Sequence, residues 1–438
     1  MTQSTGIESP IFRPSHLRES LFLVPALGAT LFGVYVLMGA EPDYLQRILL
    51  WQKQLLFAVL GIGLAFLFSR IPIPKLVLAA PWLYGINLIL LLLVFAPGVG
   101  FEKSGARSWI DLKLFTFQPS EPMKLLCILL MARILQCEKG GTVGFWKVLA
   151  ALLVAAFPSF LIAKQPDLGS ALIFPPILLA ALYGARVPRR YLALVLSPLW
   201  ALVVLLGGPF AWTAWISGVG LWLVLLGLKG ETKGRLIAFL LVQILIVLAV
   251  SNVMRPLWEK GLRPHQRDRL VGFLNRDEPD TQKMSPAQYH LHQSLVAISS
   301  GGMFGQGHGE GLQSSHGFIP MMRTDSIFAV VAEELGFVGS ILLISLLGGL
   351  LWIGISTAAA AATWTESAVV FGVLGLWSAH IFVNLGMTMG LCPITGIPLP
   401  FVSYGGTAVL SNFVALGCVF SFYRNSKRLA ALKSAGSM

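Results

Sequence analysis

The chain has 438 residues, of which 55% are hydrophobic and only 12% are charged. Because soluble domains average about 25% charged residues, this composition excludes an ordinary soluble protein and indicates a membrane protein. The formal net charge of +12 suits contact with anionic lipid or phosphate. Nucleic acid is not expected as a partner, since the basic residues are scattered among loops and form no stripe on one face.

Apolar runs long enough to cross a bilayer recur along the chain. A hydrocarbon core of about 30 Å needs roughly 20 apolar residues in a helix. By this measure we expect about twelve spanning helices, near residues 20–39, 49–68, 76–96, 122–138, 146–163, 168–185, 191–207, 210–228, 235–253, 326–354, 366–390 and 401–423. Two long polar loops, 97–121 and 254–325, interrupt them. The predicted fold is an all-α polytopic membrane protein with a single integral-membrane domain, residues 1–438.

The lysine and arginine residues predict the orientation of the chain. An even number of spans puts both termini on one side, and positive residues favour the cytoplasmic side. With the termini in the cytoplasm, the short outside loops carry only Arg47, Lys53 and Lys164. We therefore expect a multi-pass protein of the cytoplasmic (inner) membrane, with both termini cytoplasmic and the large loop near 254–325 extracytoplasmic.

The first long loop carries residues that suit a lipid with a phosphate and a sugar. Arg107 and Lys124 could grip a phosphate, and Trp109 could lie on a sugar face or among lipid headgroups. A structural interpretation is equally good, because Ser120 is a plausible N-cap. Glu121 then follows where the dipole of a helix favours an acid.

The next outer turn and the large loop carry polar residues with simple structural interpretations. Asp167 can cap the following helix, and it could also pair with Lys164. We expect the charged run 267–269 to be a solvated face and 289–302 to be a short amphipathic helix at the membrane interface. Alternating glycines at 305–311 could form an anion nest for a phosphate, but an irregular turn is the favoured interpretation.

Asp325 stands at the mouth of a long apolar run. It could simply cap the helix that follows, but Glu333 and Glu334 lie two turns further on, and acids at that depth usually face a polar cavity. At about 100° per residue Glu333 lies closer to the face of Asp325, so it is the expected partner. Arg323 should keep Asp325 ionised. An ionised carboxylate at the membrane boundary can accept a proton from a sugar hydroxyl.

The last apolar run is broken by three prolines, at 393, 398 and 400, and by a turn containing Ser403 and Tyr404. Irregular backbone at membrane depth is tolerated only where protein or a wet cavity covers it. We therefore expect a cavity near the outer leaflet.

Taken together, these strings resemble the SEDS family (shape, elongation, division and sporulation proteins). The matching strings follow the family's order between about residues 20 and 423: GARSWI, QPSE with Lys124, KQPDLG, QRDRL, QYHLHQSLVAISSGG, RTDSIFAVVAEELG and TGIPLPFVSYGG. IPLPF and the helix around Pro81 to Leu93 are similar to the RodA (elongation) branch, which we favour. PGVGFEKSGARSW leans towards the FtsW (division) branch.

The resemblance implies an inverting peptidoglycan glycosyltransferase of the bacterial cytoplasmic membrane. Such a protein would polymerise lipid II for cell-wall elongation and rod shape, beside a class B penicillin-binding protein. Asp325 matches the family's essential loop aspartate. No cofactor is certain, although a divalent cation such as Mg²⁺ could help to stabilise the leaving pyrophosphate. The candidate substrate-binding residues are Arg107, Trp109, Gln118, Ser120, Glu121, Lys124, Lys164, Asp167, Glu333, Ser403 and Tyr404.

Two departures from the family's pattern stand out. The usual Pro-Glu-x-His-Thr-Asp-Phe is replaced by Pro-Met-Met-Arg-Thr-Asp-Ser at 320–326. The family usually has ten helices, so the two predicted spans within 210–253 resemble an inserted hairpin. A lipid II flippase, an FtsW-type division enzyme and a non-catalytic scaffold are the alternative functions.

Overall fold

A computed structural model describes residues 17–40, 50–103, 106–113, 115–137, 141–206, 264–274, 284–359, 361 and 363–435, together with residues 241, 245 and 252. The helices are α1 (Leu17–Gly39), α2 (Leu50–Arg70), α3 (Ile73–Leu93), α4 (Ser120–Ile134), α5 (Phe145–Lys164), α6 (Leu168–Leu172), α7 (Phe174–Gly184), α8 (Arg189–Leu206), α11 (Pro264–Leu274), α12 (Pro286–Ser300), α13 (Leu312–Ser315), α14 (Ile327–Ala359), α15 (Trp364–Thr388) and α16 (Gly406–Ala435). The strands are β1 (Gly100–Lys103), β2 (Ala106–Asp111) and β3 (Thr116–Phe117).

Long apolar helices confirm the predicted polytopic membrane fold. Among the described residues, α2, α3, α5, α14 and α15 are long and apolar enough to cross a membrane. Shorter apolar helices cover 23–39, 168–184 and 406–422. The predicted inserted hairpin at 210–253 falls almost wholly outside the described residues, so the number of spans stays a prediction.

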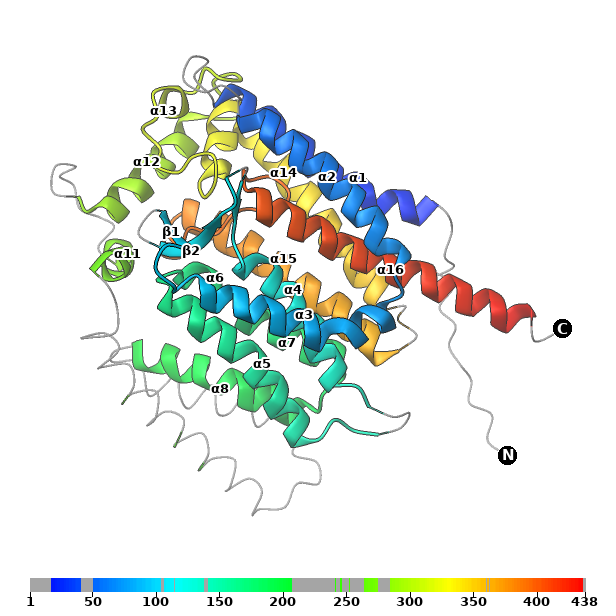
Figure 1. Cartoon of the computed structure of the whole chain (residues 1–438). Helices are drawn as coiled ribbons and strands as arrows, with labels where there is room; N and C mark the ends of the chain where they lie inside the picture. The colour runs from blue at the N-terminus through cyan, green and yellow to red at the C-terminus, as the bar shows by residue number, and fades with distance from the viewer. Residues whose placement is uncertain are drawn as a thin grey trace.

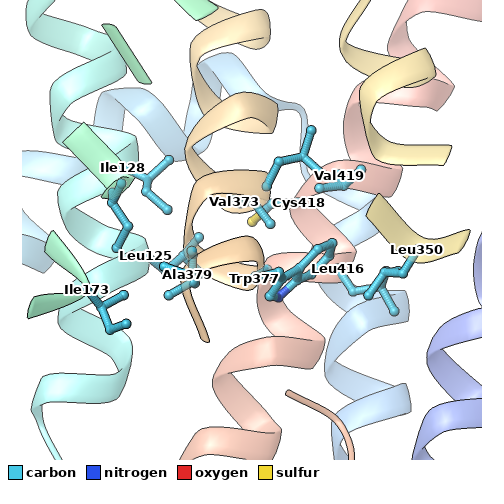
Figure 2. Close-up of a cluster of buried hydrophobic side chains, with 14 of the residues drawn as sticks. Leu125, Ile128, Ile173, Leu350, Val373, Trp377, Ala379, Leu416, Cys418 and Val419 are labelled. Carbon is cyan, nitrogen blue, oxygen red and sulfur yellow. The ribbon is translucent and has the colours of Figure 1, made fainter. Parts of the chain in front are cut away.

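Helix α15 is the centre of the bundle. The most apolar stretch of 18 residues in α15 is 67% buried, whereas the corresponding stretches of α2, α3 and α5 are each 28% buried. It contacts α4, α7, α14 and α16. Figure 2 shows Val373, Trp377 and Ala379 of α15 in a cluster with Leu125 of α4 and Leu416 of α16. A helix covered on every side by other helices is apolar around its circumference, and the polar residues it carries must therefore find partners inside the protein.

The structure differs from the expected elements at three places. The first loop holds a small antiparallel sheet in the order β1-β2-β3, which the apolar pattern did not predict. The expected span 168–185 is divided into α6 and α7 at Ile173, where Pro175 and Pro176 start a new helix. Helix α14 is kinked at Gly336, whose φ of 65° a residue with a side chain rarely adopts.

The sheet and the short helices α11, α12 and α13 gather at one end of the bundle (Figure 1). The C-terminal part of α16 extends from the opposite end. Segments from the two long polar loops therefore cover the same end of the spanning helices.

Candidate active site

Asp325 lies in a tight turn that ends where α14 begins. The carbonyl oxygen of Met321 accepts the backbone N–H groups of Thr324, Asp325 and Ser326, at 3.1, 3.0 and 3.2 Å. Met321 has a φ of 50°, in the left-handed region that favours glycine. Three donors on one carbonyl fix the backbone of Asp325 just before the spanning helix.

Arg323 holds this turn against α1. Its Nε and Nη2 atoms donate to the carbonyl oxygen of Ala40, at 3.3 and 3.2 Å, immediately after the C-terminal end of α1. Its own carbonyl accepts the N–H of Tyr404 at 3.0 Å. The guanidinium therefore takes a position at a helix C-terminus, where a cation is favoured. Its expected effect of keeping Asp325 ionised stays a prediction.

Asn384 of α15 joins Asp325 to the loop that follows α15. This fully buried side chain donates from Nδ2 to the carbonyl oxygens of Asp325 and Ile397, at 2.8 and 2.7 Å. Its Oδ1 atom accepts no hydrogen bond within the part of the chain that the structure describes. A buried acceptor without a donor is costly, which makes Oδ1 a candidate contact for a bound hydroxyl.

The carboxylate of Asp325 and the guanidinium of Arg269 flank Gly396. A Cβ atom placed on Gly396 would lie 3.2 Å from Oδ2 of Asp325 and 3.8 Å from Nη1 of Arg269. Arg269, in α11, also donates from Nη1 to the carbonyl of Thr395 at 3.1 Å. The expectation that 267–269 is only a solvated charged face is therefore wrong for Arg269.

His290 contacts the residue next to Asp325. Its Nε2 atom lies 2.6 Å from Oγ of Ser326, and the side chain is buried in α12. Burial, and then the charge of Arg269, lowers the pKa of His290 to about 4. The ring is therefore neutral at pH 7 and offers one donor and one acceptor to the turn before α14.

Lys124 and Glu121 form a buried ion pair in the first turns of α4. The Nζ atom of Lys124 lies 2.7 Å from Oε1 of Glu121, and both side chains are almost completely buried. Nζ also lies 3.0 Å from Nε2 of His380 in α15. Buried charges persist only when they are paired and hydrogen-bonded, and this group meets that condition.

The first loop and the turn after α5 are tied together by Asp167. Its Oδ1 accepts the N–H of Ser170, so Asp167 caps α6 as predicted, and its Oδ2 accepts Nε2 of Gln118, each at 3.0 Å. Ser120, in contrast, is not the predicted N-cap of α4, because Pro119 holds that position. The fully buried Oγ of Ser120 has no hydrogen-bond partner among the described residues.

Three other candidate residues, Arg107, Trp109 and Lys164, lie in or next to the outer loops, and their contact with substrate stays a prediction. Arg107 donates from Nε and Nη2 to two backbone carbonyls of its own loop, at 3.1 and 2.9 Å. Trp109 lies in β2 and is partly buried. The Nζ atom of Lys164 lies 5.0 Å from the centre of the Phe160 ring, and no Lys164–Asp167 ion pair forms in the described chain.

Glu333 and Glu334 anchor the glycine-rich segment. The carboxylate of Glu333 accepts the backbone N–H groups of Gln313 and Ser314, at 2.6 and 2.9 Å. Oγ of Ser314 donates to Glu334 at 3.3 Å. Two N–H groups of the segment donate to the backbone carbonyls of the same glutamates, at 2.9 and 3.1 Å, as in an irregular turn. Glu333 therefore holds this segment, and its expected partnership with Asp325 stays a prediction.

Ser403 and Tyr404 close the turn before α16. Oγ of Ser403 accepts the N–H of Leu399 at 2.8 Å, and its carbonyl accepts Nε2 of Gln54 at 3.0 Å. Tyr404 reaches the Asp325 turn through its backbone bond to Arg323. The expected cavity beside this turn stays a prediction.

Arg269, His290 and His380 were missed as site residues by the sequence analysis. His380 and Asn384 are spaced i, i+4 in an otherwise apolar run, and this spacing puts both polar side chains on one face of a helix. That signal could have found His380. For Arg269 and His290, only the folding of the large loop brings them to Asp325.

Known proteins resemble this chain over most of its length. A family model for cell cycle proteins of the FtsW, RodA and SpoVE type matches residues 18–218 and 212–428. The peptidoglycan glycosyltransferase MrdB of Escherichia coli is 30% identical over 416 residues, which cover 95% of each protein. Stage V sporulation protein E of Bacillus subtilis is 31% identical, over 86% of this chain and 87% of that protein.

Solved structures resemble the fold described above. One, reported as structural coordination of polymerization and crosslinking by a peptidoglycan synthase complex, aligns with a TM-score of 0.64 and 26% identity, over 92% of this chain and 97% of that chain. The rod shape determining protein RodA of Thermus thermophilus aligns with a TM-score of 0.58 and 25% identity, over 92% and 96%. The resemblance predicted from the motifs is confirmed, and the chain belongs to the FtsW/RodA/SpoVE family, the SEDS family.

Proposed function

We propose that this protein is a peptidoglycan glycosyltransferase that polymerises lipid II into glycan strands. The observation that carries the proposal is the placement of Asp325, whose backbone is fixed at the start of a spanning helix and whose carboxylate lies near the guanidinium of Arg269. The activity named for MrdB, a relative over nearly the whole chain, supports it. Relatives of both RodA and FtsW types match; cell-wall elongation is the favoured role and division the alternative.

The reaction is an inverting displacement at a sugar carbon. The 4-hydroxyl oxygen of the acceptor sugar attacks the anomeric carbon of the lipid-linked donor, and a new C–O bond forms. The bond from that carbon to the pyrophosphate oxygen breaks, and undecaprenyl pyrophosphate leaves with the electron pair. Asp325 takes the proton of the attacking hydroxyl, a step that contributes about 10²–10⁴-fold in rate.

Positive groups offset the charge that grows on the leaving pyrophosphate. Lys124 and Arg269 are the side chains that we assign to this work, because buried or partly buried cations act strongly where water is excluded. Among the described residues no three His, Cys, Asp or Glu side chains come together as a metal site. A divalent cation such as Mg²⁺ that stabilises the leaving pyrophosphate stays a prediction.

Orientation and partner follow from the same proposal. The end of the bundle that carries α11, α12, α13 and the sheet faces outward, where an extracytoplasmic lipid-linked sugar is found. A class B penicillin-binding protein supplies the crosslinking step. The structural neighbour in a complex of polymerization and crosslinking supports such a partner.

Reconstitution in liposomes tests the function. Purified protein with its penicillin-binding partner and lipid II should form glycan polymer, detected by gel separation of labelled product. Absence of polymer would overturn the proposal. If lipid II crosses the bilayer without forming polymer, and if Asp325→Asn leaves that movement unchanged, the protein is a flippase. If neither occurs while Asp325→Asn cells build normal walls, it is a scaffold.

A further inference from the structure

His380 is a buried histidine with a partner on each ring nitrogen. It lies in α15, the central helix, and its side chain is 3% exposed. Nδ1 lies 3.0 Å from the carbonyl oxygen of Pro398, and Nε2 lies 3.0 Å from Nζ of Lys124. The ring therefore bridges the Lys124–Glu121 pair of α4 and the loop between α15 and α16, which also contacts Asp325.

The partners determine which nitrogen carries the hydrogen. A carbonyl oxygen can only accept, so Nδ1 of His380 must donate to Pro398. In the neutral ring, Nε2 is then an acceptor with its lone pair directed outward. An ammonium group has donors and no acceptor, so Lys124 donates to Nε2. Both contacts are satisfied only by the neutral ring with its hydrogen on Nδ1.

In this arrangement Glu121 and His380 use two of the three N–H donors of Lys124. The ammonium carries three hydrogens, and within the described chain its hydrogen-bond acceptors are Glu121 and His380. Two acceptors at fixed positions determine where the third N–H points. With Glu121 alone, the ammonium could rotate about its flexible stem, because a lysine presents a mobile point charge.

We propose that His380 is a positioning residue that orients the ammonium of Lys124 towards the pyrophosphate of the lipid-linked donor. This rests on the proposed glycosyltransferase function and deepens it. His380 adds a second acceptor for Lys124 without adding a negative charge, so the Lys124–Glu121 pair stays electrically balanced. Its bond to Pro398 fixes the ring relative to the loop whose Gly396 lies beside Asp325. Lys124, the cation at the leaving group, is thereby held at a fixed position relative to Asp325, the base.

Two amide variants separate the contacts of the ring. In His380→Gln the amide reaches the position of Nε2 and keeps an acceptor for Lys124. In His380→Asn the shorter amide reaches the position of Nδ1, so it keeps the donor for Pro398 and loses the acceptor for Lys124. Thr388→Val is the matched control, because the hydroxyl of Thr388 is buried on the same helix and donates to backbone carbonyls of that helix.

The experiment measures polymerisation of lipid II by each variant, in complex with its penicillin-binding partner, over a range of substrate concentrations. His380→Gln and Thr388→Val should keep most of the wild-type rate. His380→Asn should lose about 10- to 100-fold, the loss expected for one hydrogen bond to a charged group. The loss should appear mainly in kcat, because the charge on the pyrophosphate develops in the transition state.

Several results would overturn the inference. Beside an active wild type, they are equal activity of the Asn and Gln variants, or an active Asn variant with an inactive Gln variant. Binding of undecaprenyl pyrophosphate to the same proteins separates this failure from failure of the proposed function. If wild type forms no polymer but binds this product more tightly than His380→Asn does, the positioning role stands and the polymerase fails. If wild type and His380→Asn bind it equally, or neither binds, the positioning role fails.

Discussion

At the scale of single residues, the surroundings of Asp325 come from separate parts of the chain. Arg269 reaches it from α11, Asn384 from α15 and Gly396 from the loop after α15, while His290 contacts the neighbouring serine. These contacts show how the turn is held with methionine at 321 and arginine at 323. Met321 contributes a carbonyl and Arg323 a contact with α1, so backbone and long-range contacts fix the turn.

Removing the charge of Arg269 should slow the reaction. Arg269→Met leaves the carboxylate of Asp325 beside an apolar side chain and removes a cation near the developing charge. We expect a loss of about 10-fold or more in polymerisation rate. Arg190→Met removes an equal charge at the start of α8, where the guanidinium lies 5.0 Å from the centre of the Tyr191 ring, and should leave the rate unchanged. Equal rates for both variants and wild type would exclude Arg269 from the site.

His290 makes stability depend on pH in a defined range. Its pKa is about 4 in the folded protein and about 6.5 when unfolded, so only the unfolded state takes up a proton between these values. Stability should therefore fall as the pH is lowered from 6.5 to 4, by about 3 kcal/mol at most, and His290 should contribute no further loss below pH 4. Thermal unfolding midpoints across this range should fall less steeply for His290→Gln. Parallel curves for the two proteins would contradict the assignment.

At the scale of elements, the sequence predicted the helices far better than their interruptions. Runs of about 20 apolar residues predict spanning helices, so α2, α3, α5 and α15 were placed within a few residues. The kink at Gly336 depends on a contact with the backbone of Met303, which lies in the loop after α12. The paired strands β1 and β2 are short and polar, and no apolar alternation marks them. Local patterns carry no information about either.

The packing against α14 of the loop that follows α12 and begins at Gly301 gives a test at this scale. A Cβ on Gly301 would lie 1.8 Å from the carbonyl oxygen of Ala332, so Gly301→Ala must push the loop away from α14. Its thermal unfolding midpoint should fall. Gly63 in α2 has no neighbour within 4 Å of its Cβ position, and Gly63→Ala should keep or raise the midpoint, since alanine is the better helix former. Equal midpoints for the two variants would show that this contact does not hold the loop.

At the scale of the whole molecule, one end of the bundle assembles the site from both long loops and from the broken backbone between α15 and α16 (Figure 1). The sequence identified Asp325, Lys124 and Asp167 because they sit in recognisable strings next to apolar runs. It missed Arg269 and His380 because their importance arises from contacts across the bundle. Asp325 was chosen as the base because it matches the loop aspartate of the family, whereas the structure explains how its backbone is held in place.

The most direct test of the account is the initial rate of glycan polymer formation by Asp325→Asn. Wild type and variant are each reconstituted with the same penicillin-binding protein and lipid II, after thermal unfolding has shown that both are folded. The amide keeps the shape of the carboxylate but cannot accept the proton of the attacking hydroxyl. The account predicts a rate lower by about 10²–10⁴-fold. An undiminished rate would contradict it.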